Sequence, residues 1–483
     1  MKDKIKALEK IALELEPSTV IRKAWTDEVI KYSDHFLDNV NKRDFAFNMD
    51  FSDHQRILPE GFGDKSFTMS SILKTMDERI DTPGLNPASK GHLGYIPGGG
   101  IYPSALGDFL AAVTNRYAGI YFGGPGAVKL ENELIQWLVK IMHYPATAHG
   151  NLTSGGSIAN LIAITTARDA KNIQPENIRT SVIYLSKQTH HCVHKAIRIA
   201  GLGYSIVREV PLDDHFRMDV SVLKSMVEQD KSNGLNPFLL VSSAGTTDTG
   251  AMDPLNELCD LAEAYNLWHH VDAAYGGFFI LLEEFQESFK GIERTDSLVI
   301  DPHKGLFLPY GLGTVLIKDV KAMEASHHYI ASYMQDAEKV SLEISPANLS
   351  PELTKHFRGM RMWLPMQLFG LKPFVAALEE KILLTRYFYQ EIQKQDFEVG
   401  PFPDMSVMLF RYLPKSGDPN AFNEKLMQAI HKDGRVFFSS TSVNGVFWLR
   451  IAILCYRTHL HTVDLCLQMI QENLDKLLSS ANQ

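Results

Sequence analysis

The chain has 483 residues, 45% hydrophobic and 22% charged, which is the balance of a folded globular protein and not of a disordered or fibrous one. Its formal net charge is −9 and it has no run of basic residues, which argues against nucleic acid as a partner. The four cysteines lie far apart without CxxC pairs, so neither a disulfide framework nor a zinc cluster is expected: Cys192, Cys259, Cys455 and Cys466.

The first twenty residues, MKDKIKALEKIALELEPSTV, combine apolar residues at helical spacing with several acids. They lack the unbroken apolar core and the cleavage site of a signal peptide. No uncharged apolar stretch of about 18 residues follows, so no membrane span is expected. These observations predict a cytoplasmic protein.

Residues 1–90 are expected to form a helical arm. Ile5, Leu8, Ile11 and Leu15 recur with the period of a helix, and a second helical pattern covers residues 24–40. Two further helices are expected over residues 104–116 and 129–142.

From residue 150 the pattern changes to short apolar runs separated by amphipathic segments. Strands are expected at 181–186, 205–210, 237–244, 267–274, 297–302 and 313–319. Helical patterns lie between most of them, for example at 220–229 and 255–265. Such alternation predicts βαβ units and a mostly parallel sheet, whose ligands bind at the carboxyl ends of the strands.

The C-terminal part has a different pattern. Residues 320–372 have few strand signals, and the polar stretch at 335–355 is expected to be a loop. From 373 onward helices alternate with apolar runs at 405–413 and 446–454, which is typical of a small α+β domain. The expected organisation is therefore an arm at 1–90, a large α/β domain at 91–372 and a small α+β domain at 373–483.

The stretch NLTSGGSIANLIAI contains a candidate anion site. Gly155, Gly156 and Ser157 run directly into a helical pattern, so backbone amides, a hydroxyl and the positive end of a helix dipole converge there. Phosphate is the usual occupant of such a site. An ordinary glycine-rich loop with a serine cap is the alternative.

Two further candidates follow strand ends. In WHHVDAAYGG, Asp272 ends a buried strand, where an isolated carboxylate needs a donor or a cation. In VIDPHKGLF, Lys304 follows a strand end about one βαβ unit later. Desolvation there would favour its neutral form, which can form a Schiff base with an aldehyde. The alternatives are a capping aspartate and a surface lysine.

The stretch SKQTHHCVHKA gathers histidines. His190 and His194 have the i,i+4 spacing of a helical metal site, but HExxH and a third carboxylate ligand are missing. A flat imidazole stacked on an aromatic cofactor is the preferred reading. Pyridoxal phosphate needs the whole set: an anion cradle, a stacking ring, a carboxylate for its ring nitrogen and an amine for its aldehyde.

The motifs HVDAAYGG and DPHKG, in this order, resemble those of the group II pyridoxal-phosphate-dependent amino-acid decarboxylases, and the resemblance runs from 91–110 to 447–458. It implies the α/β fold of the pyridoxal-phosphate-dependent transferases (fold type I). It also implies the following roles: Lys304 as Schiff-base lysine, His303 near the phosphate, Asp272 on the ring nitrogen, Ala274 below and His190 above the ring, Gly155, Gly156 and Ser157 as phosphate loop, Thr247 near the ring substituents, Tyr95 and Pro97 in the substrate pocket, and Arg450 near the entrance.

The chain departs from the animal aromatic decarboxylases of this family in three places. Pro346 aligns with their proton-donating tyrosine, although Tyr329 and Tyr333 stand near the start of the same loop. Asp301 replaces an asparagine, so it is not expected to bind the phosphate, and Gly305 replaces a tryptophan, which would open space near the cofactor. The resemblance is therefore to a divergent member of bacterial type.

Decarboxylation of an L-amino acid to the amine is the expected reaction. The assignable pocket stretches, GYIPGGGIYP and AGIYFGGPGAV, offer aromatic and small residues, which favours an aromatic or bulky neutral substrate. Four alternatives stay open: an aldehyde synthase, a decarboxylase of glutamate or another acidic amino acid, an inert homologue, and a metal hydrolase, which lacks ligands. The resemblance also implies a homodimer with the active site at the interface.

Overall fold

The fold is that of a computed structural model, which describes residues 1–42, 63–328 and 342–481. Its centre is a seven-stranded sheet in the order β1-β7-β6-β5-β4-β2-β3. The strands are β1 (His149–Thr153), β2 (Ser181–Ser186), β3 (Ile206–Val210), β4 (Asn236–Ser243), β5 (Trp268–Asp272), β6 (Ser297–Ile300) and β7 (Gly313–Ile317). Strand β7 is antiparallel to both neighbours and the other pairs are parallel. This is the expected α/β class with a mostly parallel mixed sheet.

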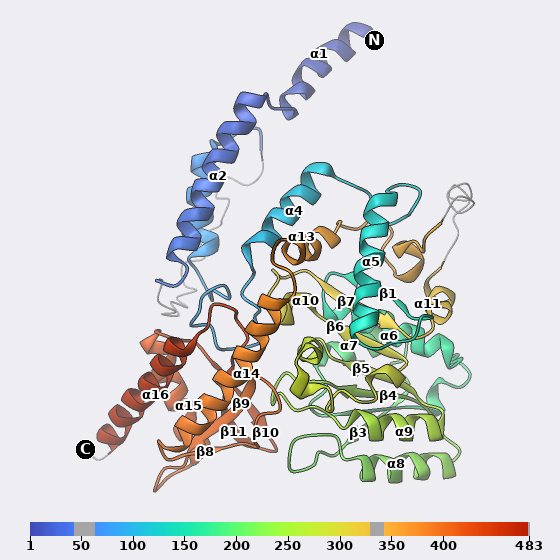
Figure 1. The fold of residues 1–483 in the computed structure, drawn as a ribbon, viewed down its shortest axis with the longest axis vertical. Coiled ribbons are helices and arrows are strands. Elements are labelled where there is room, and N and C mark those ends of the chain that lie inside the picture. Colours follow the sequence, from blue (N-terminus) through green and yellow to red (C-terminus); the bar gives the residue numbers. More distant parts are fainter. Residues whose placement is uncertain (43–62, 329–341, 482–483) are drawn as a thin grey trace.

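Helices cover both faces of the sheet (Figure 1). Alternate residues of β2 show this directly, because Ile183 packs in one buried cluster with α6 and α7 and Tyr184 in another with α8 and α9. The helices of this domain are α4 (Tyr102–Thr114), α5 (Pro125–Ile141), α6 (Gly156–Ala170), α7 (His191–Ile199), α8 (Val220–Ser232), α9 (Leu255–Tyr265), α10 (Pro302–Gly305), α11 (Val320–His327) and α13 (Gly359–Phe369).

A smaller antiparallel sheet, ordered β10-β11-β9-β8, lies beside the large domain (Figure 1). Its elements are α14 (Lys372–Gln393), β8 (Phe397–Val399), β9 (Val407–Tyr412), α15 (Pro419–Asp433), β10 (Ser439–Val443), β11 (Val446–Ala452) and α16 (Leu460–Ala481). The backbone of Leu93 bonds to Phe437 and Ala452, so the chain near residue 93 packs with this domain. The domain bounds given above stay a prediction.

The N-terminal helices α1 (Lys2–Ala12) and α2 (Thr19–Asn39) extend away from the body of the molecule (Figure 1). Neither contains a buried residue. Several apolar side chains along the arm are therefore exposed to solvent, among them Ile5, Leu8, Ile11, Val20 and Trp25. A shorter helix, α3 (Met69–Met76), packs against α2.

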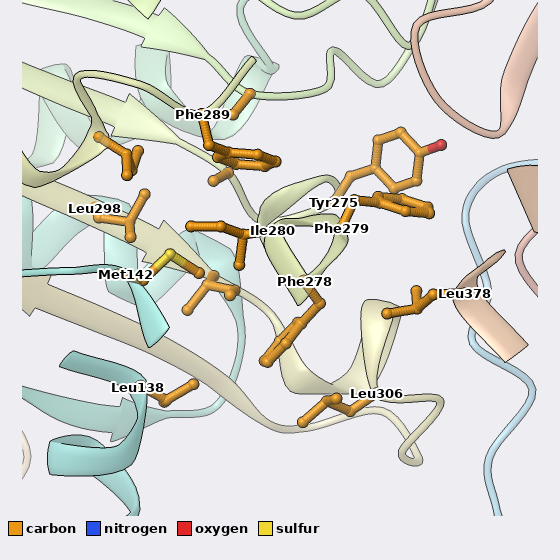
Figure 2. Packing of buried hydrophobic residues seen from close by; sticks show 14 of the residues in the cluster. Leu138, Met142, Tyr275, Phe278, Phe279, Ile280, Phe289, Leu298, Leu306 and Leu378 are labelled. Atoms are coloured by element: carbon orange, nitrogen blue, oxygen red, sulfur yellow. The ribbon is translucent and has the colours of Figure 1, made fainter. Parts of the chain in front are cut away.

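A buried apolar cluster supports the loops at the carboxyl edge of the large sheet. Phe278, Phe279 and Ile280 follow directly after β5 and pack with Leu306, which comes just after α10 (Figure 2). All four side chains are at most 2% exposed, which for Phe and Leu is worth roughly 1.5–3 kcal/mol each. The cluster thus fixes the two loops that follow Asp272 and Lys304.

A search of the described helices for a stretch both long and apolar enough to cross a membrane finds none.

Candidate active site

Three strand ends of the large sheet meet around one cavity of about 420 Å³. β1 leads into α6, β5 ends at Asp272, and β6 leads into α10, which carries Lys304. The prediction that the ends of β5 and β6 lie together is confirmed, since Asp272 pairs in register with Val299. All the residues predicted to surround a cofactor line this cavity: Gly155, Gly156, Ser157, His190, Thr247, Asp272, Ala274, His303 and Lys304.

Part of the cavity wall is a glycine turn at the start of α6. Gly155 has φ +150°, a conformation that favours glycine, and its N–H bonds the Thr153 hydroxyl at 3.3 Å. A Cβ on Gly313, in the neighbouring β7, would lie 2.6 Å from Gly155 backbone atoms. Two glycines thus let β7 and the start of α6 approach closely, which leaves backbone amides at the N-terminus of α6 to face an anion.

Asp301 and Lys304 lie beside this turn. The Asp301 carboxylate is 2% exposed, and its Oδ2 is 3.5 Å from Lys304 Nζ. Its Oδ1 has no hydrogen-bond partner among the described residues. Burial raises the pKa of Asp301, and the charges of Lys304 and His303 oppose that shift.

His303 lies in the same wall, and a hydrogen bond from one ring nitrogen holds its imidazole in place. Its Nδ1 is 2.6 Å from the carbonyl oxygen of Leu312, which only accepts, so Nδ1 carries the proton. Burial lowers the pKa of His303. The neutral ring therefore presents its other nitrogen, Nε2, as an acceptor.

Asp272 lines the same cavity, and both of its carboxylate oxygens accept hydrogen bonds. Oδ1 accepts from the Ala274 backbone N–H at 3.0 Å, and Oδ2 accepts from Asn160 Nδ2 at 3.3 Å. The residue is 8% exposed. These two hydrogen bonds fix the orientation of the carboxylate.

His190 stands before α7, not inside it. Its Nδ1 accepts from the Cys192 backbone N–H at 3.3 Å, so the imidazole is the N-cap of the helix. Burial is the main cause that lowers its pKa. The i,i+4 helical spacing with His194 is thereby lost, and no group of three metal-ligating side chains occurs among the described residues.

The three predicted substrate residues lie outside the cavity walls. Arg450 is 2% exposed and donates to the carbonyl oxygens of Thr247 at 2.5 Å and Tyr95 at 3.2 Å. The guanidinium is buried and connects two loops, and its place near the entrance stays a prediction. Tyr95 is 58% exposed, and Pro97 is buried.

Two departures from the family have structural consequences. Pro346 is buried and begins a 3₁₀ segment, Pro346–Leu349, so this position has no acid to donate. Tyr329 and Tyr333 lie outside the described residues. The expectation that Gly305 opens space is wrong, because a Cβ there would lie 2.7 Å from Phe278 Cβ, and the buried Phe278 fills that volume.

Several residues of the site were not predicted. Asn160 bonds Asp272, His270 bonds Asn160 at 2.8 Å, and Gly313 permits the close approach of β7. Asn160 lies one turn after Gly156, and His270 lies two residues before Asp272 on the same face of β5. Asn160 and His270 could have been identified from the sequence by their spacing from Gly156 on a helix and from Asp272 on a strand.

The site matches what pyridoxal phosphate requires of a protein. It combines a glycine turn at a helix N-terminus, a buried carboxylate, a lysine and an imidazole around one cavity. The buried Asp301 Oδ1, which has no hydrogen-bond partner among the described residues and lies next to the glycine turn, does not suit an anion.

The chain matches the description "Pyridoxal-dependent decarboxylase conserved domain" over residues 52–413. It is 35% identical over 372 residues to the aromatic-L-amino-acid decarboxylase of Bacillus atrophaeus, covering 76% of this chain and 77% of that protein. It is 29% identical over 453 residues to the phenylacetaldehyde synthase of Petunia hybrida, covering 88% of each.

Solved structures have the same fold. The Oryza sativa TDC with PLP and tryptamine gives a TM-score of 0.91 at 22% identity, covering 95% of this chain and 99% of that one. The Catharanthus roseus tryptophan decarboxylase in complex with L-tryptophan gives 0.89 at 24% identity, with the same coverage. With the sequence match over most of its length, the chain belongs to the family of pyridoxal-phosphate-dependent amino-acid decarboxylases, which are carboxy-lyases.

Proposed function

We propose that this enzyme decarboxylates an aromatic or bulky neutral L-amino acid to the amine, with the cofactor attached to Lys304. The observation that carries the proposal is the lining of the cavity. Its basic side chains are His190, His303 and Lys304, and it contains no arginine among the described residues. An acidic substrate would need a free cation for its second carboxylate, whereas these three groups surround the cofactor.

Each wall of the cavity has a role in this proposal. The amides at Gly155, Gly156 and Ser157 bind the phosphate, with His303 beside it, and Lys304 holds the cofactor aldehyde. Bound pyridoxal phosphate supplies an electron sink for the charge left on the α-carbon when carbon dioxide departs.

Four other lining residues orient the ring in this proposal. Asp272 holds a proton on the ring nitrogen, while Ala274 and His190 enclose the ring from its two faces. Thr247 borders the ring substituents. Arg450 acts through the carbonyl groups of Thr247 and Tyr95, so that Tyr95 and Pro97 border the substrate from a loop that Arg450 restrains.

An aldehyde synthase is the second candidate, and the buried Pro346 favours it. Without an acid at that position, proton return to the α-carbon depends on Lys304 or His190. One relative of similar length is a phenylacetaldehyde synthase. An acidic-substrate decarboxylase and an inert homologue are less well supported, because the described lining residues include no further cation and keep Lys304, Asp272 and His190.

The proposed assembly is a cytoplasmic homodimer with the active site at its interface. The exposed Tyr95 and the uncovered apolar side chains of the arm both support a partner subunit.

Borohydride reduction followed by peptide mass spectrometry tests the attachment. A pyridoxyl group on Lys304 is expected, and Lys304→Ala should abolish both the label and the visible absorption. Lys290→Ala, at an exposed lysine, is the control. A label that persists in Lys304→Ala would refute the assignment.

An amino-acid screen tests the reaction and the substrate class. Equal amounts of carbon dioxide and amine from tryptophan, tyrosine or phenylalanine support decarboxylation. Aldehyde and ammonia would instead identify the synthase, and turnover of glutamate alone would refute the neutral-substrate proposal.

A further inference from the structure

A line of buried polar side chains runs from Asp272 into the interior of the large domain. Asn160 Nδ2 is 3.3 Å from Asp272 Oδ2, and Asn160 Oδ1 is 2.8 Å from His270 Nε2. His270 Nδ1 is 2.8 Å from Ser297 Oγ, which is 2.8 Å from Trp268 Nε1. Asn160, His270 and Ser297 have no exposed surface, so water does not compete for these bonds.

The direction of every hydrogen bond in this line can be derived. Asn160 Nδ2 also lies 2.9 Å from the Gly156 carbonyl oxygen, which only accepts, so the amide is oriented with Oδ1 towards His270. An amide oxygen likewise only accepts, so His270 Nε2 must carry a proton. Burial lowers the pKa of His270 to about 4, so the ring is neutral and Nδ1 accepts from the Ser297 hydroxyl.

The donors therefore all point the same way. The indole N–H of Trp268 donates to Ser297, Ser297 donates to His270, His270 donates to Asn160, and Asn160 donates to the Asp272 carboxylate. Aligned hydrogen bonds polarise one another in a low-dielectric interior. The last acceptor is the group that the proposed function places on the ring nitrogen.

Strand geometry explains why these residues meet. Side chains alternate between the faces of a strand, so His270 and Asp272 share the face of β5 that packs on α6, where Asn160 lies one turn from the glycine turn. His269 points the other way and bonds Ser242 and Cys259 instead. The same strand thus carries two buried neutral histidines, of which one is connected to the site.

We propose that Asn160 and His270 are positioning residues that hold the Asp272 carboxylate in place, aimed at the ring nitrogen of the cofactor. This rests on the proposed function, in which Asp272 faces that nitrogen. Loss of a hydrogen bond to a charged group weakens an interaction by about tenfold to a hundredfold. Cofactor affinity should therefore fall even in variants whose fold is unchanged.

The test uses the full-length enzyme with Asn160→Leu, His270→Leu, the conservative His270→Gln, the control His269→Leu, and Asp272→Ala for reference. Two readouts are independent of turnover: the Kd of pyridoxal phosphate from quenching of tryptophan fluorescence, and the ¹⁵N chemical shift of ring-labelled cofactor, which reports the proton on the ring nitrogen. Glutamine at 270 keeps a donor for Asn160 and is the rescue variant.

Asn160→Leu and His270→Leu should raise the Kd about tenfold or more and shift the ¹⁵N resonance towards the unprotonated ring, while His270→Gln and His269→Leu stay close to wild type. If His270→Leu does not fold, Asn160→Leu at the cavity wall decides alone. An unchanged Kd and shift in Asn160→Leu, with both altered in Asp272→Ala, overturns this inference and leaves the proposed function standing. An unchanged shift in Asp272→Ala overturns both.

Discussion

Asp301 is a residue whose buried charge opposes both protein stability and binding at the proposed phosphate site. Its carboxylate is buried next to the glycine turn, and one oxygen lacks a partner among the described residues. A Cβ on Gly156 would lie 2.9 Å from its other oxygen, so the charge lies against the proposed phosphate site. The pair with Lys304, at 3.5 Å, compensates only part of this.

Asp301→Asn should therefore stabilise the cofactor-free protein at neutral pH. Burial raises the pKa of Asp301 in the folded state, so the wild type is destabilised once the pH exceeds the ordinary carboxyl range. The gain on substitution, on the order of 1 kcal/mol, should grow with rising pH and level off above the raised pKa.

Urea unfolding of both proteins between pH 4.5 and 8 measures this difference. The variant should also bind inorganic phosphate and pyridoxal phosphate more tightly, since a negative charge has gone. A variant that is less stable at pH 8 than at pH 4.5, relative to wild type, would show that the pair with Lys304 dominates instead.

At this scale the sequence predicts residues whose chemistry is distinctive. Lys304, Asp272 and the glycine turn each had an ordinary alternative, and they were identifiable because together, in this order, they make the set that pyridoxal phosphate requires. Asn160 and His270 were not identified, because each is an ordinary polar residue until a partner from another element is known. Gly305 was misread because the space it leaves belongs to Phe278, a contact that sequence alone does not reveal.

The start of α6 is the element that forms the proposed anion site, and β7 packs closely against it. Thr153, Gly155 and Gly313 lie together where β1 pairs with β7. A side chain at 313 would meet backbone atoms of Gly155, which cannot rotate away as a side chain can.

Gly313→Ala should therefore displace the turn and weaken binding of pyridoxal phosphate by at least about tenfold, with a loss of roughly 1–3 kcal/mol in stability. Gly126→Ala is the matched control, because it lies in the first turn of α5 with open space around it. Fluorescence titration and thermal unfolding of both variants check this. Equal cofactor affinity in the two would contradict the role given to β7.

Elements were predicted well where apolar runs were strong. β2 and α9 match their predicted ranges, and β3 to β7 shift by a few residues at their ends. β1 was missed because HGNLT contains one β-branched residue and two residues that disfavour strands. Its strand conformation depends on pairing with β7, a partner more than 150 residues away.

At the scale of the whole molecule, the main feature is an N-terminal arm that has no hydrophobic core of its own. α1 and α2 have no buried residue, yet apolar side chains recur along both. Isolated helices of this length gain little stability in water. The proposed homodimer, with the arm packed against the second subunit, would explain both the helical pattern and the exposed apolar surface.

Substitutions that introduce charges into the apolar surface of the arm should therefore weaken the proposed dimer. Leu8→Glu with Ile11→Glu places two carboxylates on the apolar side of α1, where burial against a partner would cost several kcal/mol. Sedimentation velocity should show two chains per particle for wild type and for the control Lys6→Glu, but a larger share of single chains for the double variant. Because the proposed active site lies at the interface, cofactor affinity should fall in parallel with dissociation. A wild-type protein that sediments as one chain would refute the homodimer and leave the Lys304 site to be explained within a single subunit.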